Sequence, residues 1–307
     1  MPLAEGLRPS VAFVVVADYV APDGRAWGHE RRMLRALAAQ EAGTPFEVIV
    51  VEHSRLHGHI PAGVREILPA ARWQFTEPVH SGLMKDAGTA VTDAEWVAVF
   101  EMDCVPAPGW LSGVLAAAKA HPEASVITGP VRYPGKTSFE RACSVLHRGA
   151  LSRGRDGPTR RFASSGALFR RDVALEYPHL PAATPFLAAR ERRRRMLRDG
   201  HQFWFTRAAE TIHAFDGLRF VLDLHRNVGY ADMHTLGAGR PGIGTIPRAA
   251  RRRLREELRS IWTARGELRP FDWPLVVALL LAARIAEAPG WADALRGRAA
   301  PAATNYR

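Results

Sequence analysis

The chain has 307 residues, 47% of them hydrophobic and 24% charged, a balance typical of a globular protein with a sizeable core. Two cysteines, Cys104 and Cys143, exclude a framework of disulfides and a cysteine-based zinc motif, so a reducing, cytoplasmic location is expected. The net charge of +11 favours anionic partners: nucleotide phosphates, anionic lipid or nucleic acid. Residues 1–10 show no basic and apolar regions of a signal peptide.

The first part of the chain predicts a β-α-β unit. Apolar strands are expected at residues 11–16 and 46–51, with a helix at 29–40 between them. This length suits a right-handed parallel unit. The second strand ends in the polar sequence Glu52-His53-Ser54.

The following residues continue the alternation of strands and helices. Helices are expected at 81–92, capped by Ser81, and at 186–199, where arginines crowd the sequence. The further strands expected lie at residues 70–76, 96–100, 125–129, 162–169, 203–205 and 211–215. This order predicts an α/β fold with a doubly wound, mostly parallel sheet flanked by helices.

The apolar run 96–100 ends in two acids, Glu101 and Asp103, separated by one residue. Side chains two apart on a strand point the same way, so both carboxylates are expected to face one small volume. In open α/β sheets, ligands bind beyond the carboxyl ends of the strands. Two oxygen donors at that edge suit Mg²⁺ or Mn²⁺ shared with a substrate phosphate, whereas a surface turn with solvated acids is the alternative.

The last part of the chain differs in kind, and a domain of residues 1–235 followed by a helical extension of residues 236–307 is predicted. After a linker at 241–244, a helix rich in arginine is expected, followed by an apolar helix at 274–288. The apolar helix is expected to be too short and too charged to cross a membrane. It either lies on an anionic membrane surface, helped by the arginines, or packs on the core as an appendage.

The order of these features resembles that of family 2 glycosyltransferases of the GT-A fold, over roughly residues 10–215. The family's acidic motif after the second strand corresponds here to Val50-Val51-Glu52-His53-Ser54. Its Ala-Arg-Asn-x-Gly corresponds to Met84-Lys85-Asp86-Ala87-Gly88, and its Asp-x-Asp to Glu101-Met102-Asp103. Pro-Gly-Trp-Leu follows at 108–111, and residues 162–171 are similar to the family's small-residue strand before an Arg-Arg pair.

Two stretches depart from the family pattern. The first loop carries Ala17-Asp18-Tyr19-Val20 where the family has Pro-Thr-Tyr-Asn. The helix near residue 190 begins Leu187-Ala188-Ala189-Arg190-Glu191 where the family has Glu-Asp, the Asp being its catalytic base. The Gln-x-x-Arg-Trp motif of the processive synthases does not occur, which argues against a polymerising enzyme.

The resemblance implies a non-processive, inverting, metal-dependent hexosyltransferase-like enzyme. It would move a sugar from a nucleotide-diphosphate donor to a hydroxyl of a saccharide or lipid-linked acceptor. Asp103 is the implied ligand of Mg²⁺ or Mn²⁺, and Glu101 is either a second ligand or a ribose contact. His213 lies where some relatives have a histidine that reaches the metal or the diphosphate. The alternative is a histidine that is hydrogen-bonded in a turn.

The same resemblance implies nucleotide contacts from the loop, strand and helix motifs: Asp18, Glu52, Lys85 and Asp86. Lys85 either touches phosphate or is a solvated helix lysine. Glu52 either accepts a hydrogen bond from the base imide or caps a turn, and Asp18 either contacts the nucleoside or is a plain loop acid.

Glu191 is the implied catalytic base, and an acid paired along a basic helix is the alternative. The neighbouring arginines 192–195 form either a solvated helix face or a grip for an anionic acceptor. Three other functions stay open: a nucleotide-sugar-binding protein with impaired catalysis, a nucleotidyltransferase that releases pyrophosphate, and a nucleic-acid binder. The last is disfavoured because no aromatic platform accompanies the basic residues.

Overall fold

The computed structural model describes residues 9–17, 27–40, 43–77, 80–152, 155–180, 185–215, 217–237 and 240–298. The chain forms two compact units, each containing segments from separate parts of the sequence. An α/β unit comprises the residues up to Val131 and Arg155–His213, and a helical unit comprises Arg132–Gly154 and the residues from Ala214 onward. The domain boundary expected near residue 235 stays a prediction.

The α/β unit contains an eight-stranded mixed sheet in the order β3-β2-β1-β4-β9-β6-β10-β8. Strands β1, β2, β3 and β4 run parallel to one another, as predicted. Strand β9 lies between β4 and β6 and is antiparallel to both. The strands are β1 (Val11–Val16), β2 (Phe46–His53), β3 (Arg72–Thr76), β4 (Trp96–Glu101), β6 (Ala124–Thr128), β8 (Gly157–Thr159), β9 (Ala167–Arg170) and β10 (Gln202–Phe205). A second sheet has the order β5-β11-β7, with β5 (Cys104–Pro106), β7 (Val131–Arg132) and β11 (Thr211–His213).

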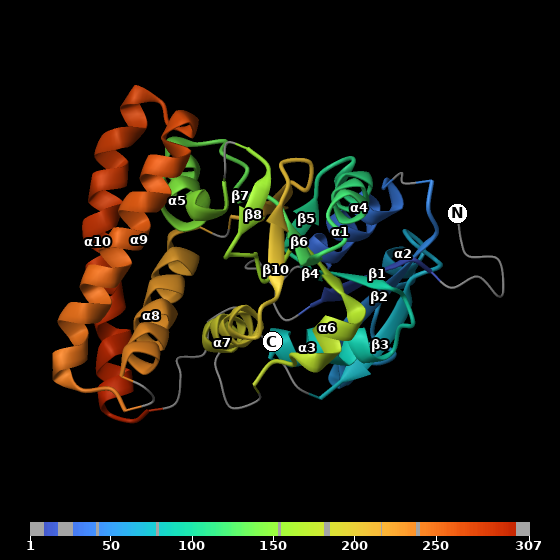
Figure 1. Cartoon of the computed structure of the whole chain (residues 1–307), viewed down its shortest axis with the longest axis horizontal. Helices are drawn as coiled ribbons and strands as arrows, with labels where there is room; N and C mark the ends of the chain where they lie inside the picture. The colour runs from blue at the N-terminus through green and yellow to red at the C-terminus, as the bar shows by residue number, and fades with distance from the viewer. Residues whose placement is uncertain are drawn as a thin grey trace. The chain divides into compact units, whose positions relative to one another are not determined.

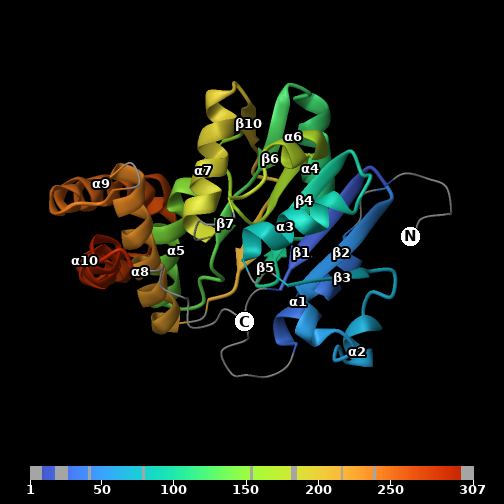
Figure 2. The same ribbon diagram turned by 90° about the horizontal axis from the view of Figure 1, so that it is seen from below.

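Helices cover both faces of the large sheet, and β1 shows why its sequence is apolar throughout. Phe13 and its alternate neighbours pack with helices α1 and α4, whereas Val14 and its alternate neighbours pack with α3, α6 and α7. Figure 2 shows these helices around the sheet. A strand buried on both faces has no polar side to present. The helices of this unit are α1 (Gly28–Ala38), α2 (Ala62–Arg65), α3 (Ser81–Ala90), α4 (Trp110–Ala120), α6 (Arg171–Glu176) and α7 (Pro185–Arg198).

Helix α3 approaches the sheet closely because Gly88 has no side chain. A Cβ atom at residue 88 would lie 2.4 Å from Val14 Cγ1 and 2.8 Å from Val51 Cγ2, well inside van der Waals contact. The glycine that ends the motif Met84–Gly88 therefore sets the depth at which α3 packs. The cap of this helix is His80, whose Nδ1 accepts a hydrogen bond from the backbone N–H of Gly82, so the expected cap at Ser81 was wrong.

The helical unit contains α5 (Ser138–Arg148), α8 (Gly217–Leu236), α9 (Ile246–Ala264) and α10 (Trp273–Leu295) (Figure 1). Helix α8, 20 residues long, was not predicted. Helix α10 extends beyond both ends of the expected helix 274–288 and continues through Pro289. The expectation that it is too short to cross a membrane was therefore wrong: the segment Pro270–Leu295 is long and apolar enough by length and composition.

Candidate functional site

The carboxyl end of β4 delivers two acids to the edge of the sheet, as predicted. Glu101 is the last residue of β4 and pairs in register with Val16 of β1. The backbone N–H of Met102 donates to the carbonyl of Val16 at 2.9 Å, and the chain then turns through Asp103 into β5. The pairing with β1 thus fixes the point at which Asp103 leaves the sheet.

Asp103 is 1% exposed, and its two carboxylate oxygens have different neighbours. Oδ1 lies 3.3 Å from Sγ of Cys104, whereas Oδ2 lies 3.7 Å from Nδ1 of His213. His213 arrives from a distant part of the sequence because β11 pairs antiparallel with β5, which sets His213 opposite Cys104. The predicted candidates Glu101, Asp103 and His213 are therefore neighbours, and Cys104 joins them.

This carboxylate edge cluster, defined as Glu101, Asp103, Cys104 and His213, fits a divalent cation. One possible ligand atom from each residue lies within 4.8 Å of the others. Oδ2 of Asp103 is buried and receives no hydrogen bond from the part of the chain that the structure describes. A buried, ionised oxygen without a donor is costly, and a cation would satisfy it. Carboxylates and imidazole together suit Mn²⁺ or Mg²⁺, with the imidazole favouring the softer of the two.

Lys85 is not a solvated helix lysine. Its ammonium is buried and lies 2.6 Å from Oε1 of Glu101 and 2.8 Å from the carbonyl of Ser164. The backbone N–H of Glu101 donates to Oγ of Ser165, so the small-residue stretch before β9 also holds this end of β4. Since one oxygen of Glu101 already binds Lys85, Oδ2 of Asp103 is the carboxylate oxygen of this cluster that is more available to a cation.

Two other predicted nucleotide contacts occupy defined places near the same sheet edge. Glu52 is fully buried near the end of β2, where Oε1 accepts from the backbone N–H of His53 at 3.1 Å. Asp86 binds the backbone N–H of His179 at 2.7 Å and its imidazole Nδ1 at 2.9 Å. Asp86 therefore anchors the segment between α6 and α7. Asp18 lies outside the described residues.

The arginine run on α7 is only partly solvated. Arg192 is 3% exposed, stacks over the ring of Phe169 at 4.8 Å and donates to the carbonyl of Ala174. Burial lowers the pKa of Arg192 to about 10 and that of His179, its neighbour, to about 4. His179 was not predicted, because a single histidine in a loop carries no local signal in the sequence. Its role follows only from the contacts with Asp86 and Arg192.

Glu191 lies in α7 with its side chain 31% exposed, and its carboxylate is 3.6 Å from the exposed guanidinium of Arg194. Among the described residues, Glu191 makes no hydrogen bond or ion pair with the carboxylate edge cluster. The contact with Arg194 corresponds to the alternative given for Glu191 from the sequence, an acid paired along a basic helix. The catalytic role of Glu191 stays a prediction.

Comparisons with known proteins agree with this arrangement. Residues 82–177, which include α3, β4 and β9, match the family model described as Glycosyl transferase family 2. The mannosyltransferase PcManGT from Pyrobaculum calidifontis, solved in complex with GDP-Man and Mn²⁺, is similar in structure, with a TM-score of 0.60 and 14% identity. That alignment covers 94% of this chain and 88% of the mannosyltransferase.

TarS residues 1–349 from S. aureus give a TM-score of 0.49 and 12% identity over 93% of this chain and 90% of TarS. No curated protein sequence matches the chain. The predicted resemblance to family 2 glycosyltransferases and the predicted GT-A fold are confirmed.

Proposed function

We propose that this chain, a family 2 glycosyltransferase of the GT-A fold, transfers a hexose from a nucleotide-diphosphate donor to an acceptor hydroxyl. The observation that carries the proposal is the carboxylate edge cluster at the end of β4, where a buried oxygen of Asp103 receives no hydrogen bond from the residues that the structure describes. In open α/β sheets this edge is where ligands bind. We further propose that the acceptor is a saccharide or a lipid-linked molecule and that the protein is cytoplasmic.

Asp103 and His213 would hold the divalent ion, with Glu101 as a third ligand or a ribose contact. The bound ion would neutralise the charge that develops on the departing nucleotide diphosphate. Lys85, held by Glu101, places a buried positive charge beside this edge and adds to the attraction for phosphate. Glu52 and Asp86, together with Asp18, would bind the nucleoside portion.

Glu191 is the proposed general base, which would take the proton of the acceptor hydroxyl as that oxygen attacks the anomeric carbon. Attack from the face opposite the leaving group inverts the configuration at that carbon. The proposal requires the carboxylate of Glu191 to leave Arg194, a surface ion pair of little strength. Absence of the Gln-x-x-Arg-Trp motif supports a single transfer rather than processive synthesis.

A thermal-shift panel of nucleotide diphosphates and nucleotide sugars, with and without Mn²⁺, tests donor binding because a bound ligand raises the melting temperature by mass action. GDP-mannose enters first, since the structural neighbour was solved with it. Asp103→Ala is expected to remove the metal-dependent shift. The matched control is Asp93→Ala, at an exposed acid before the other end of β4, and it should keep the shift. An unchanged response in Asp103→Ala would place the ion elsewhere.

The pairing of Glu191 with Arg194 favours one second candidate, a nucleotide-sugar-binding protein that has lost catalysis. Turnover of a donor sugar with Mn²⁺ distinguishes the two. We expect Glu191→Gln to preserve donor binding while slowing transfer, and unaltered turnover would remove Glu191 from the role. Release of pyrophosphate instead of nucleoside diphosphate would identify a nucleotidyltransferase.

A further inference from the structure

Helix α10 has an inverted distribution of polar and apolar side chains. A helix on the surface of a soluble protein directs its apolar residues inward and its charged residues outward. On α10 every exposed residue is apolar, and the four large ones are between 42% and 76% exposed. These exposed residues are Trp273, Pro274, Val277, Ala278, Leu281, Ala282, Ile285, Ala288 and Pro289.

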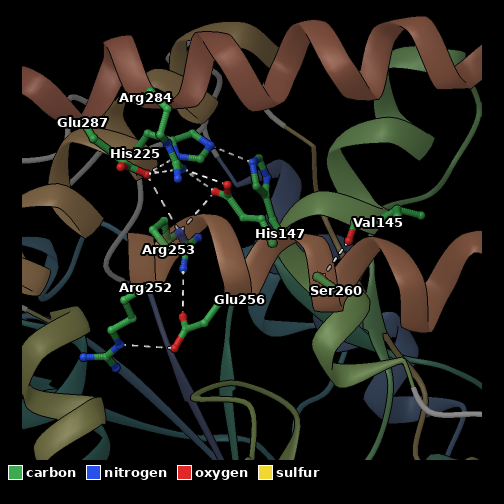
Figure 3. Close-up of polar contacts among 10 residues, drawn as sticks. Val145, His147, His225, Arg252, Arg253, Glu256, Ser260, Arg284 and Glu287 are labelled. Carbon is green, nitrogen blue, oxygen red and sulfur yellow. Dashed lines mark hydrogen bonds and ion pairs between the residues drawn. The ribbon is translucent and has the colours of Figure 1, made fainter. Parts of the chain in front are cut away.

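The charged residues of α10 point into the helical unit instead. Arg284 binds both oxygens of Glu257 on α9 at 2.8 Å and Oε1 of Glu287 at 2.7 Å. Figure 3 shows Arg284, Glu287, Arg253 and His225 directed toward one another. Further along, Asp293 binds Arg226 of α8 at 2.7 Å. The ion pairs of the helix thus lie within the helical unit, and the exposed residues of its outer face are all apolar.

Helix α9, which lies beside α10 in Figures 1 and 2, adds the positive charge. Its outer side has an apolar stripe, Leu254, Leu258 and Trp262, and each member lies three residues beyond an exposed arginine. Across residues 240–298, nine arginines are exposed, whereas the only exposed acid among the described residues is Glu267. The exposed arginines are Arg240, Arg248, Arg251, Arg255, Arg259, Arg265, Arg269, Arg296 and Arg298.

We propose that the outer face of α9 and α10 is a binding surface for an anionic lipid bilayer, with α10 lying in the plane of the membrane interface. An apolar face of this extent in contact with water marks an interaction site. On α9, apolar residues beside arginines, with Trp262 among them, form the pattern of an interfacial helix, and α10 adds an exposed apolar face that begins at Trp273. The surplus of exposed arginine makes anionic headgroups the complementary partner.

The internal ion pairs of α10 favour lying on the bilayer over crossing it. Crossing would pull Arg284 and Glu287 away from Glu257 and into hydrocarbon, where unpaired charges are strongly disfavoured. Lying on the surface buries the apolar face and leaves these pairs intact. A second copy of the chain fits less well, because symmetric pairing would bring two arginine-rich surfaces together. Nucleic acid would leave the apolar face in water.

Co-sedimentation of the full chain with vesicles tests the proposal. Phosphatidylcholine vesicles are compared with vesicles in which about a third of the lipid is phosphatidylglycerol, at low and high salt. Each arginine near an anionic surface contributes about 1 kcal/mol, so the triple variant Arg251→Gln, Arg255→Gln, Arg259→Gln should bind on the order of a hundred-fold more weakly. The matched control changes three exposed arginines of the α/β unit, Arg32, Arg35 and Arg65, to Gln and should bind normally.

The apolar part is tested with Leu281→Glu and Ile285→Glu together, which should lower binding at least about tenfold. The control pair, Val91→Glu and Leu175→Glu, changes two exposed apolar residues of the α/β unit and should leave binding unchanged. Circular dichroism confirms that each variant is folded. Carbonate at high pH should release the bound chain from the vesicles.

Several results would overturn the proposal. These are absence of binding to anionic vesicles, equal binding by Leu281→Glu/Ile285→Glu, and retention in the membrane through carbonate, which would indicate a crossing helix. A dimer in solution that the Leu281→Glu/Ile285→Glu pair dissociates would assign the face to a second copy of the chain.

Discussion

The two units each contain a cluster of acids and histidines with closely spaced ligand atoms, yet the clusters differ in what accompanies them. In the α/β unit, Asp103 and His213 meet beside one lysine, which binds Glu101. In the helical unit, His225, Glu257 and Glu287 lie equally close together, but Arg253 and Arg284 bind the same carboxylates. Guanidinium groups in the second cluster already supply the positive charge that a metal ion would bring.

Residue types alone therefore do not define a metal site. The carboxylates of the helical cluster already have donors, because Arg284 binds both oxygens of Glu257 and Oε1 of Glu287. Burial raises the pKa of Glu257, whereas Arg253 and Arg284 act in the opposite direction. His225 there places Nδ1 3.3 Å from Glu287 and Nε2 3.0 Å from His147. Because a carboxylate only accepts, the proton of neutral His225 belongs on Nδ1, and His147 donates to Nε2. In the carboxylate edge cluster, by contrast, Oδ2 of Asp103 has no donor within the described part of the chain and is available to a cation.

The largest effect on sugar transfer is expected from removing the negative charge of the Asp103 carboxylate. Asp103→Asn should lower the Mn²⁺-dependent kcat/KM for sugar transfer by about 10³-fold or more, roughly 4 kcal/mol, while the fold survives. Glu257→Gln, an equivalent change in the helical cluster, should leave the Mn²⁺ response of the folded protein unaltered. Both are measured by steady-state transfer assays at a temperature below the melting point of each variant. Loss of the metal response in Glu257→Gln alone would reverse the assignment of the two clusters.

The converse change removes a guanidinium from the helical cluster. Arg284→Met leaves two buried carboxylates with less compensation, so the free energy of unfolding should fall by about 3–5 kcal/mol. Urea unfolding followed by circular dichroism gives this value. Arg296→Met, at an exposed arginine just after α10, is the control and should change it by less than about 0.5 kcal/mol. Equal stability of the two variants would show that the buried network contributes nothing.

Acid should weaken both units through one buried histidine each. Burial lowers the pKa of His179 and of His225 to about 4, below the ordinary value of 6.5. The contribution of each neutral histidine to the free energy of unfolding is complete above pH 6.5. It is lost as the pH falls toward 4, and the loss is at most roughly 3 kcal/mol for each histidine. Urea unfolding at several pH values between 7.5 and 4.5 measures the loss. His225→Gln should flatten the dependence, and an unchanged profile would exclude His225 as a source.

The sequence predicted the centre of the α/β unit well because β1 and most of β4 are apolar runs and the helix between β1 and β2 is periodic. It also placed Glu101 and Asp103 at a strand end, since the period of a strand fixes which side chains share a face. The partners of these residues were harder to predict. Lys85 reaches Glu101 only because Gly88 lets α3 lie close to the sheet, and Cys104 joins His213 only through strand pairing.

The helical unit was less predictable because its order depends on tertiary contacts. Helix α8 mixes polar residues such as His225 and Asn227 with apolar ones, and these polar residues are buried against neighbouring helices. A helix with buried polar residues has no clean apolar stripe, so periodicity misses it. The helix expected at 274–288 continues through Pro289 as α10, where Gly290 packs against the backbone of Arg226. Packing of this kind leaves no signal in a local sequence window.

Removing the N-cap of a helix is expected to have the smallest effect on the free energy of unfolding, and each unit offers one such cap. Thr137 caps α5 by accepting from the backbone N–H of Glu140 at 3.1 Å, and His80 caps α3 by accepting from that of Gly82 at 3.1 Å. Thr137→Ala and His80→Ala should each lower the free energy of unfolding by about 1 kcal/mol. Only His80→Ala should also weaken nucleotide binding, by a few fold, because α3 positions Lys85 against Glu101. Titration calorimetry with a nucleoside diphosphate and Mn²⁺ measures the affinity, and equal losses in both variants would detach α3 from the site.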